Sequence, residues 1–186
     1  MMNEVLKTIA DRYSCRGYQN KPVEQEKVAA IAKAGLQAPS ALNAQPWHII
    51  AINSKELIDE INDHVMDILR VAEDQTAYNR LMERGGTAYY NAPTMFLVLK
   101  QPDAHAWVGI DCGIVIQSMA LAATSLGLGN VVVAMAQTAF AGPRADEFKA
   151  KVNWPAGYEF AMGMIAGYPE VTKEPHEIDE SKLTLI

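Results

Sequence analysis

The longest apolar stretch of the chain, residues 108–128, constrains the fold more than any other segment. It is apolar on nearly every side of a helix, although Asp111, Gln117 and Ser118 interrupt it. Because a carboxylate is costly inside a bilayer, a buried helix around 110–126 fits this stretch better than a membrane span. Such a helix must be covered all round, either by its own sheet or by another subunit. The stretch therefore predicts a central helix and favours a dimer.

Shorter helical and strand patterns surround this segment. Apolar residues at helical spacing predict a helix at 3–11 with Asn3 as N-cap, a second from Pro22 to about Ala38, and a third that opens on a capping box of Asn53 and Glu56. Short runs rich in branched residues predict strands at 47–52, 94–99, 131–134 and 158–166. Residues 72–91 are ambiguous, since they could cover a site or merely connect elements.

Strands interleaved with helices favour a layered α/β or α+β protein, because a sheet between helices buries both of its faces. No stretch has the composition of a linker, so we expect one domain over residues 1–186. The spacing alone does not fix strand order or direction. A parallel doubly wound sheet and a mixed sheet both remain open.

Charge and cysteine content exclude several classes of protein. The net charge of -6 argues against a nucleic-acid partner, which needs a basic face. The N-terminal residues carry acidic groups and lack the pattern of a secretory signal. Cys15 and Cys112 are too few for a disulfide framework. We therefore expect a cytoplasmic protein without a nucleic-acid or membrane partner.

A basic cluster follows the first predicted helix. In the segment Arg12-Tyr13-Ser14-Cys15-Arg16, two guanidinium groups stand four residues apart with a hydroxyl between them. Arginine offers a planar fork of donors that suits phosphate, to which a serine hydroxyl and backbone donors can add. A solvated charged loop is the alternative interpretation. Cys15 between two arginines permits a redox role, although a spectator thiol is the simpler interpretation.

A second polar loop leads into the first predicted strand. Two prolines hold it, and it gathers Pro39, Ser40, Asn43 and Gln45. Asparagine and glutamine present both donors and acceptors, which matches the edge of a heterocycle. Turn chemistry, in which these side chains satisfy their own backbone, is the alternative interpretation.

The two loops together resemble the nitroreductase family. The resemblance spans nearly the whole chain and rests on four ordered motifs, namely Arg12-x-Ser14-x-Arg16, Pro39-Ser40-x-x-Asn43-x-Gln45-Pro46-Trp47, Gly127-Leu128-Gly129 before an apolar strand, and Gly167-Tyr168-Pro169 followed by a basic residue. Members of this family are similar in the order and spacing of these motifs. Some relatives differ in having an acidic residue and a glycine in place of Ala134-Met135.

The resemblance implies an α+β fold with a mixed central sheet flanked by helices, in which two subunits interlock as a homodimer. It implies FMN at the dimer interface, contacted by both chains. Carried over residue by residue, Arg12 and Lys173 would hold the phosphate. Ser14 and Arg16 would face the ribityl chain and the pyrimidine end of the ring, and Tyr13 would belong to the same site. Pro39, Ser40, Asn43 and Gln45 would line the flavin edge, and backbone groups near Ala134 and Met135 would approach the reactive ring nitrogen.

The function implied by the resemblance is electron transfer from NAD(P)H through FMN to nitroaromatics, quinones or similar small acceptors. A flavin-binding or storage protein without turnover is the alternative from another class. The four histidines form no metal-ligand motif, no GxSxG elbow marks a serine hydrolase, and the glycines at 127–129 precede a strand where a dinucleotide fold needs them to follow one. We therefore expect no metal, no acyl transfer and no Rossmann domain.

Overall fold

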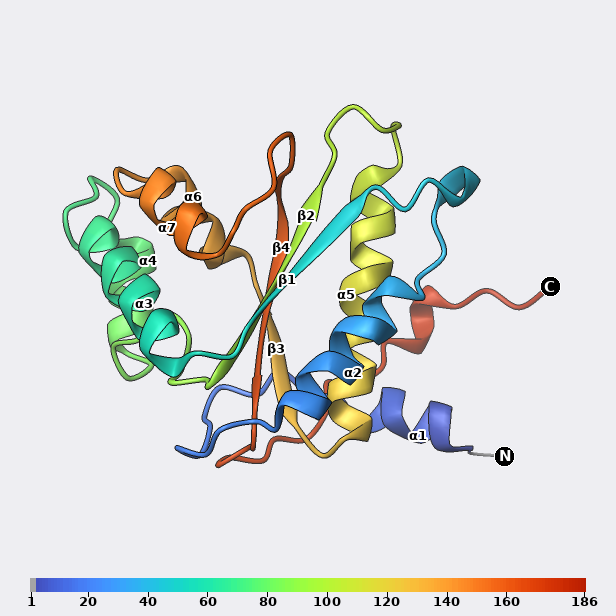
Figure 1. Ribbon diagram of the computed structural model, residues 1–186. Helices are drawn as coiled ribbons and strands as arrows, with labels where there is room; N and C mark the ends of the chain where they lie inside the picture. The colour runs from blue at the N-terminus through green and yellow to red at the C-terminus, as the bar shows by residue number, and fades with distance from the viewer. Residues whose placement is uncertain (1–2) are drawn as a thin grey trace.

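The computed structural model describes residues 3–186, in which a four-stranded sheet lies between two layers of helices (Figure 1). The strands are β1 (Trp47–Ile52), β2 (Thr94–Lys100), β3 (Gly129–Val133) and β4 (Glu159–Gly167). One layer holds α3 (Lys55–Arg70), α4 (Thr76–Met82), α6 (Gln137–Ala141) and α7 (Ala145–Lys151). The opposite layer holds α1 (Glu4–Asp11), α2 (Gln25–Leu36) and α5 (Val108–Ser125). Short 3-10 turns cover Ala41–Asn43, Ala134–Ala136 and Glu180–Lys182.

The sheet has the strand order β1-β2-β4-β3, and its three strand pairs are antiparallel. A parallel component is confined to a single bridge between Ser14 and Asn130 of β3. This arrangement confirms the α+β class and excludes the parallel doubly wound sheet that the sequence pattern had left open. It also makes β3 an edge strand, whose outer side receives the N-terminal loop.

Strand β2 shows why the sheet needs a helical layer on each side. Its side chains alternate between two separate cores: Met95, Leu97 and Leu99 face the core under α3, α6 and α7, whereas Phe96 and Val98 face the core under α2 and α5. All five are fully buried. A strand buried on both faces reads as a continuous apolar run, because neither face meets water.

Helix α5 is the central helix that the apolar stretch predicts. It packs on α2 and on the sheet, and it is long and apolar enough to span a membrane by length and composition alone. Only 44% of its residues are buried in the single chain. Ile110, at 58% exposure, lies on the open face. The chain's own sheet therefore covers part of this helix, and the rest of its apolar surface stays open.

Local details differ from the sequence predictions in three places. The third helix is capped by Ser54, whose side chain accepts a hydrogen bond from the Leu57 amide, and the predicted capping box at Asn53 is wrong. Asn53 is drawn away because its amide donates to the Val23 carbonyl and its oxygen accepts from Thr94. Helix α2 ends two residues before Ala38. Helices α6 and α7 follow β3 without having been predicted.

Candidate functional site

The N-terminal loop, residues 12–18, is fixed to one end of the sheet by backbone pairing. The Cys15 amide donates to the Asn130 carbonyl at 3.0 Å, next to the Ser14–Asn130 bridge. Tyr18 forms a bridge with Pro169, just after β4. These contacts place the predicted phosphate-binding residues beside the start of β3. They also place them beside the segment that leads to Lys173.

A close approach at Gly129 sets the position of this loop. A β-carbon at Gly129 would lie 2.7 Å from Cys15 Sγ, which is closer than such atoms can pack. Cys15 is completely buried, and its thiol lies 3.3 Å from the Gly17 carbonyl oxygen, to which it donates. A buried thiol of this kind is a packing group without access to solutes. The structure therefore favours the spectator interpretation of Cys15.

The cations of this region are free of carboxylate partners. Among residues 3–186, Arg70 and Arg144 pair with acidic side chains, whereas Arg12, Arg16 and Lys173 form no ion pair. Arg16 makes only a long hydrogen bond, 3.4 Å, from Nη1 to the Ser14 carbonyl. In a chain with net charge -6, unpaired guanidinium groups beside one another are available to an anion.

Tyr13 joins the loop to the tail. Its hydroxyl donates to the Val171 carbonyl at 2.8 Å, and the Glu170 amide donates to the Gly17 carbonyl at 3.0 Å. Partial burial, with a smaller contribution from Cys15, raises the pKa of Tyr13 to about 12, so its hydroxyl stays a donor at neutral pH. Tyr13 thus holds the backbone two residues before Lys173 next to Arg12 and Ser14.

The second polar loop, residues 39–45, lies in a left-handed turn before β1. Leu42, Asn43 and Gln45 have φ angles of 56°, 53° and 47°. Such angles are uncommon for residues with a side chain and persist only where the surroundings enforce them. The Gln45 amide donates to Ser40 Oγ at 2.9 Å, and Gln45 Nε2 donates to Asn43 Oδ1 at 3.1 Å. The side chains of Asn43 and Gln45 are exposed, so they are available to a ligand.

A buried carboxylate at the start of α5 supports this turn. Asp111 is 3% exposed, and its two oxygens lie 3.3 and 3.4 Å from the Ala41 amide that they accept from. His105 Nε2 lies 3.1 Å from Asp111 Oδ2, although it is not aligned for a good hydrogen bond. His105 Nδ1 accepts from the Trp107 amide at 3.1 Å, which leaves Nε2 on the side of Asp111. Asp111 therefore anchors the loop that carries Asn43 and Gln45.

The two polar loops lie at opposite ends of the sheet. Trp47, directly after the second loop, pairs with Lys100 at the end of β2. Asn130, beside Ser14, pairs with Ala166, which pairs with Thr94 at the start of β2. A strand of this length spans roughly 20 Å. Within one chain the structure brings together Arg12, Tyr13, Ser14, Arg16 and the approach to Lys173, and it separates them from Pro39, Ser40, Asn43 and Gln45.

Ala134 and Met135 follow β3 in the 3-10 turn Ala134–Ala136, at the opposite end of the strand from the bridge with Ser14. Both residues line a cavity of about 430 Å³ between the end of β3 and α4. Its lining consists of Asp74, Thr76, Ala77, Arg80, Leu81, Arg84, Ala88, Tyr90, Val132, Val133, Ala134 and Met135. Residues 72–91, ambiguous in the sequence, thus form one wall of a cavity beside predicted site residues.

Sequence reasoning missed the roles of Asp111 and of two arginines in this cavity. Asp111 was visible as the one carboxylate inside the most apolar stretch, and that contrast was a usable signal. Arg80 and Arg84 were visible as two arginines four residues apart.

No group of three or more potential metal-binding side chains occurs among residues 3–186.

Comparison with known proteins gives a consistent match. A sequence model of the nitroreductase family matches residues 9–168. The structure is similar to a nitroreductase with bound FMN from Desulfitobacterium hafniense, at 44% identity and a TM-score of 0.94 over 100% of both chains. It is also similar to a nitroreductase with bound FMN from Bacteroides fragilis, at 28% identity and a TM-score of 0.87 over 100% of both chains. The FMN reductase (NAD(P)H) of Bacillus subtilis is 30% identical over 71% of this chain and 54% of its own length.

Proposed function

Because the chain belongs to the nitroreductase family, we propose that it is an FMN-dependent oxidoreductase that passes electrons from NAD(P)H to nitroaromatic, quinone or similar small acceptors. The observation that carries this proposal is the N-terminal loop. It presents Arg12 and Arg16 without carboxylate partners beside Ser14, and it is fixed to a strand whose far end opens on a cavity.

The donors of this region fit the chemistry of FMN. Arg12 and Lys173 would hold the phosphate, because guanidinium and ammonium groups form charge-assisted hydrogen bonds to phosphate oxygens. The hydroxyl of Ser14 would add a further donor. Tyr13 would act indirectly, by fixing the tail that carries Lys173.

The remaining residues would orient and polarise the flavin ring. FMN held here would supply the redox chemistry that carries electrons from NAD(P)H to the acceptor. Arg16 would stabilise the negative charge that reduction places on the pyrimidine side of the ring. Backbone groups of Ala134 and Met135 would lie near the reactive nitrogen. For a nitro acceptor, one NAD(P)H and one proton yield NAD(P)⁺, a nitroso product and one water.

A homodimer would complete the site, since Asn43 and Gln45 lie at the wrong end of the sheet to reach the same flavin in their own chain. The loop of residues 39–45 from one subunit would then meet the N-terminal loop of the other. At such a site NAD(P)H and the electron acceptor would bind the same face of the flavin ring in turn, and NAD(P)H would leave before the acceptor binds.

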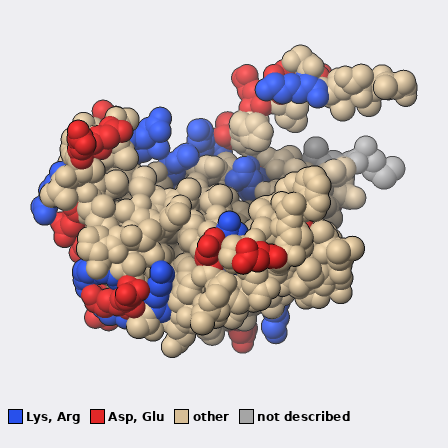
Figure 2. Space-filling model, turned by 90° about the horizontal axis from the view of Figure 1, so that it is seen from above, with Lys and Arg blue, Asp and Glu red and all other residues tan. Residues whose placement is uncertain are grey.

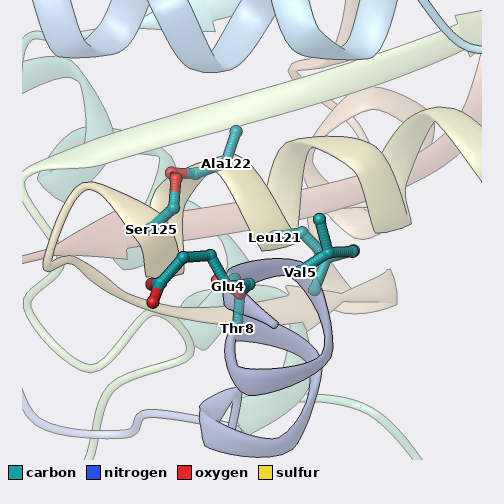
Figure 3. A pocket seen from close by; sticks show the side chains of 6 residues that line it. All are labelled: Glu4, Val5, Thr8, Leu121, Ala122 and Ser125. Carbon is teal, nitrogen blue, oxygen red and sulfur yellow. Dashed lines mark hydrogen bonds between the residues drawn. The ribbon is translucent and has the colours of Figure 1, made fainter. Parts of the chain in front are cut away.

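The open apolar surface around α1 and α5 suits such an assembly. Helix α1 buries none of its residues, and its Val5 and Ile9 are 63% and 48% exposed. Figure 3 shows side chains of α1 beside side chains of α5. They line a hollow of about 300 Å³. Its lining consists of Glu4, Val5, Thr8, Leu121, Ala122 and Ser125. Open apolar surface of this kind supports the proposed contact with a second chain.

The C-terminal residues point to the same assembly. They extend away from the body of the molecule (Figures 1 and 2), and Ile178, Leu183 and Leu185 are 83%, 65% and 85% exposed. An extended arm with apolar side chains gains stability by lying on a second copy.

The cytoplasm is the location that we propose for this dimer.

The visible absorption spectrum of the purified protein tests the function. We expect a flavin band that bleaches within seconds when NADH or NADPH is added without oxygen, and that returns when a nitroaromatic or quinone is supplied. A protein that neither contains flavin nor takes up added FMN contradicts the proposal. Flavin that is bound but never bleached by either nicotinamide indicates a carrier protein instead of an enzyme.

A further inference from the structure

The cavity between α4 and the end of β3 contains a pair of cations that the proposed flavin contacts do not use. Arg80 lies on α4 and Arg84 two residues after its end, and both side chains are exposed. Both line the cavity together with Ala134 and Met135. Any molecule in this cavity that reaches the end of β3 therefore also meets two guanidinium groups.

These two arginines have no carboxylate partner. Among residues 3–186 neither forms an ion pair, in contrast to Arg70 and Arg144. Asp74 is the one acidic residue in the lining. It already accepts from the Thr76 amide at 2.9 Å, and hydrogen bonding to Thr76 holds the pKa of Asp74 below its ordinary value. Even with this carboxylate ionised, the cavity keeps one net positive charge.

The other walls are apolar and partly aromatic. Leu81 and Ala88 are buried, and Tyr90 and Met135 are half-buried. Tyr90 has a φ angle of 52°, so a left-handed backbone holds its ring at this wall. Apolar walls with a few charged groups on one side are typical of sites for small amphipathic ligands. The combination suits an aromatic ring with an acidic substituent.

The size of the cavity favours a small molecule over a dinucleotide. Its volume of about 430 Å³ lies in the lower part of the range of about 300–1,000 Å³ for ligand pockets. A dinucleotide in this place would extend far into solvent, whereas a single substituted benzene ring fits within this volume. The two arginines would then contact the reacting molecule itself.

We propose that this cavity selects aromatic electron acceptors that carry a carboxylate, with Arg80 and Arg84 binding the carboxylate. The inference rests on the proposed function and assigns the substrate class of its acceptor site. Arg80 and Arg84 are specificity-determining residues, since they hold a substituent away from the reacting group.

A matched pair of acceptors tests this assignment. The rate constants kcat/KM for 4-nitrobenzoate and for the neutral 4-nitrobenzamide are measured on the flavin-loaded protein and on the variants Arg80→Gln and Arg84→Gln. We expect each variant to lose about tenfold in kcat/KM for the benzoate, because a charge-assisted contact is removed, and to keep its value for the benzamide. Arg70→Gln, which removes an exposed arginine paired with Asp67, is the control and should change neither.

A binding measurement separates this inference from the proposed function. Benzoate, which cannot be reduced, is titrated into the protein by calorimetry, with benzamide as the neutral probe. We expect benzoate to bind more tightly than benzamide, and to lose this advantage in both arginine variants. Equal losses for both acceptors, or an unchanged benzoate preference in both variants, overturn the inference. If wild-type protein reduces neither acceptor yet binds benzoate through these arginines, the proposed function fails and the anion site stands.

Discussion

The two polar loops of this molecule are held in place by different means. Residues 12–18 are fixed by backbone pairing to β3 and to the segment after β4, and by the close contact of Cys15 with Gly129. Residues 39–45 are held by side chains, with three left-handed residues and a buried carboxylate at Asp111. The first loop is part of the sheet, whereas the second depends on a few polar contacts.

This difference suggests different roles for the loop at residues 12–18 and the loop at residues 39–45 in the proposed site. A loop that extends a sheet keeps its position in the single chain, which suits the residues that would hold a phosphate. A loop held by a few polar contacts can adjust when another chain arrives. Because the two loops lie about 20 Å apart, the proposed flavin site would need the first loop of one subunit and the second loop of another.

The largest expected effect comes from mixing two inactive variants. One carries Arg12→Ala and Lys173→Ala, and the other carries Asn43→Ala and Gln45→Ala. If each site uses the first loop of one chain and the second loop of its partner, a mixed dimer has one site with all changes and one site with none. Activity should therefore return to about half that of the wild type per mixed dimer. Activity that stays absent after the subunits have exchanged would contradict a site shared between two subunits.

Removing one phosphate contact should weaken flavin binding strongly. The change Arg12→Ala is expected to cost about 1.5–3 kcal/mol of FMN binding, since a charge-assisted hydrogen bond is lost. Fluorescence titration of the apoprotein with FMN measures the change, and Arg70→Ala is the control. An unaltered dissociation constant would remove Arg12 from the site.

Crowding the first loop should also weaken flavin binding. The change Gly129→Ala forces Cys15 away from β3 and is expected to destabilise the loop by about 1–3 kcal/mol. FMN titration and urea unfolding together measure the effect. Adding Cys15→Ala removes the sulfur but leaves a Cβ contact of 2.8 Å, so recovery should be partial. Flavin affinity equal to that of the wild type would show that the loop position is unimportant.

Loosening the second loop should have a smaller effect. The change Asp111→Asn removes the negative charge that faces the Ala41 amide, and we expect about 1 kcal/mol weaker FMN binding. Amide hydrogen exchange at residues 41–45 should become faster. The control is Asp103→Asn, which alters an exposed carboxylate nearby. Unchanged exchange in the loop would rule out Asp111 as its anchor.

The smallest expected effect concerns the redox potential. The change Arg16→Ala removes an exposed cation from the proposed flavin site, and a contribution of about 1 kcal/mol corresponds to about 20 mV for a two-electron couple. Reduction should become harder, so the midpoint potential should fall. Equilibrium titration against a reference dye measures it. A potential equal to that of the wild type would leave Arg16 without this role.

Most of the fold could be predicted from local patterns, because long periodic segments such as α3 and α5 and short apolar runs such as β2 carry clear signals. Helices α6 and α7 could not, since they are short and are stabilised mainly by burying Phe140 and Phe148 in the core. The N-cap of α3 also needed tertiary information. Asn53 and Ser54 are equally good caps by composition, and the contact of Asn53 with Val23 decides between them.

The candidate site was predictable as a set of residues but not as an arrangement. The motifs identify Arg12, Ser14, Asn43 and Gln45, yet their placement at opposite ends of the sheet depends on strand order and direction, which local patterns do not encode. The cavity beside Met135 likewise depends on how α4 folds over β3. The sequence alone does not show that Arg80 and Arg84 line the same cavity.

Helix α5 connects the two properties that this protein would need to combine. One end carries Asp111 and so holds the loop at Ala41, and its side facing away from the sheet leaves Ile110 uncovered. A partner subunit that covers this side would contact the same helix whose Asp111 anchors the loop. If the flavin site is shared between subunits, subunit association and flavin binding are thermodynamically linked, so dilution of the protein should weaken flavin binding.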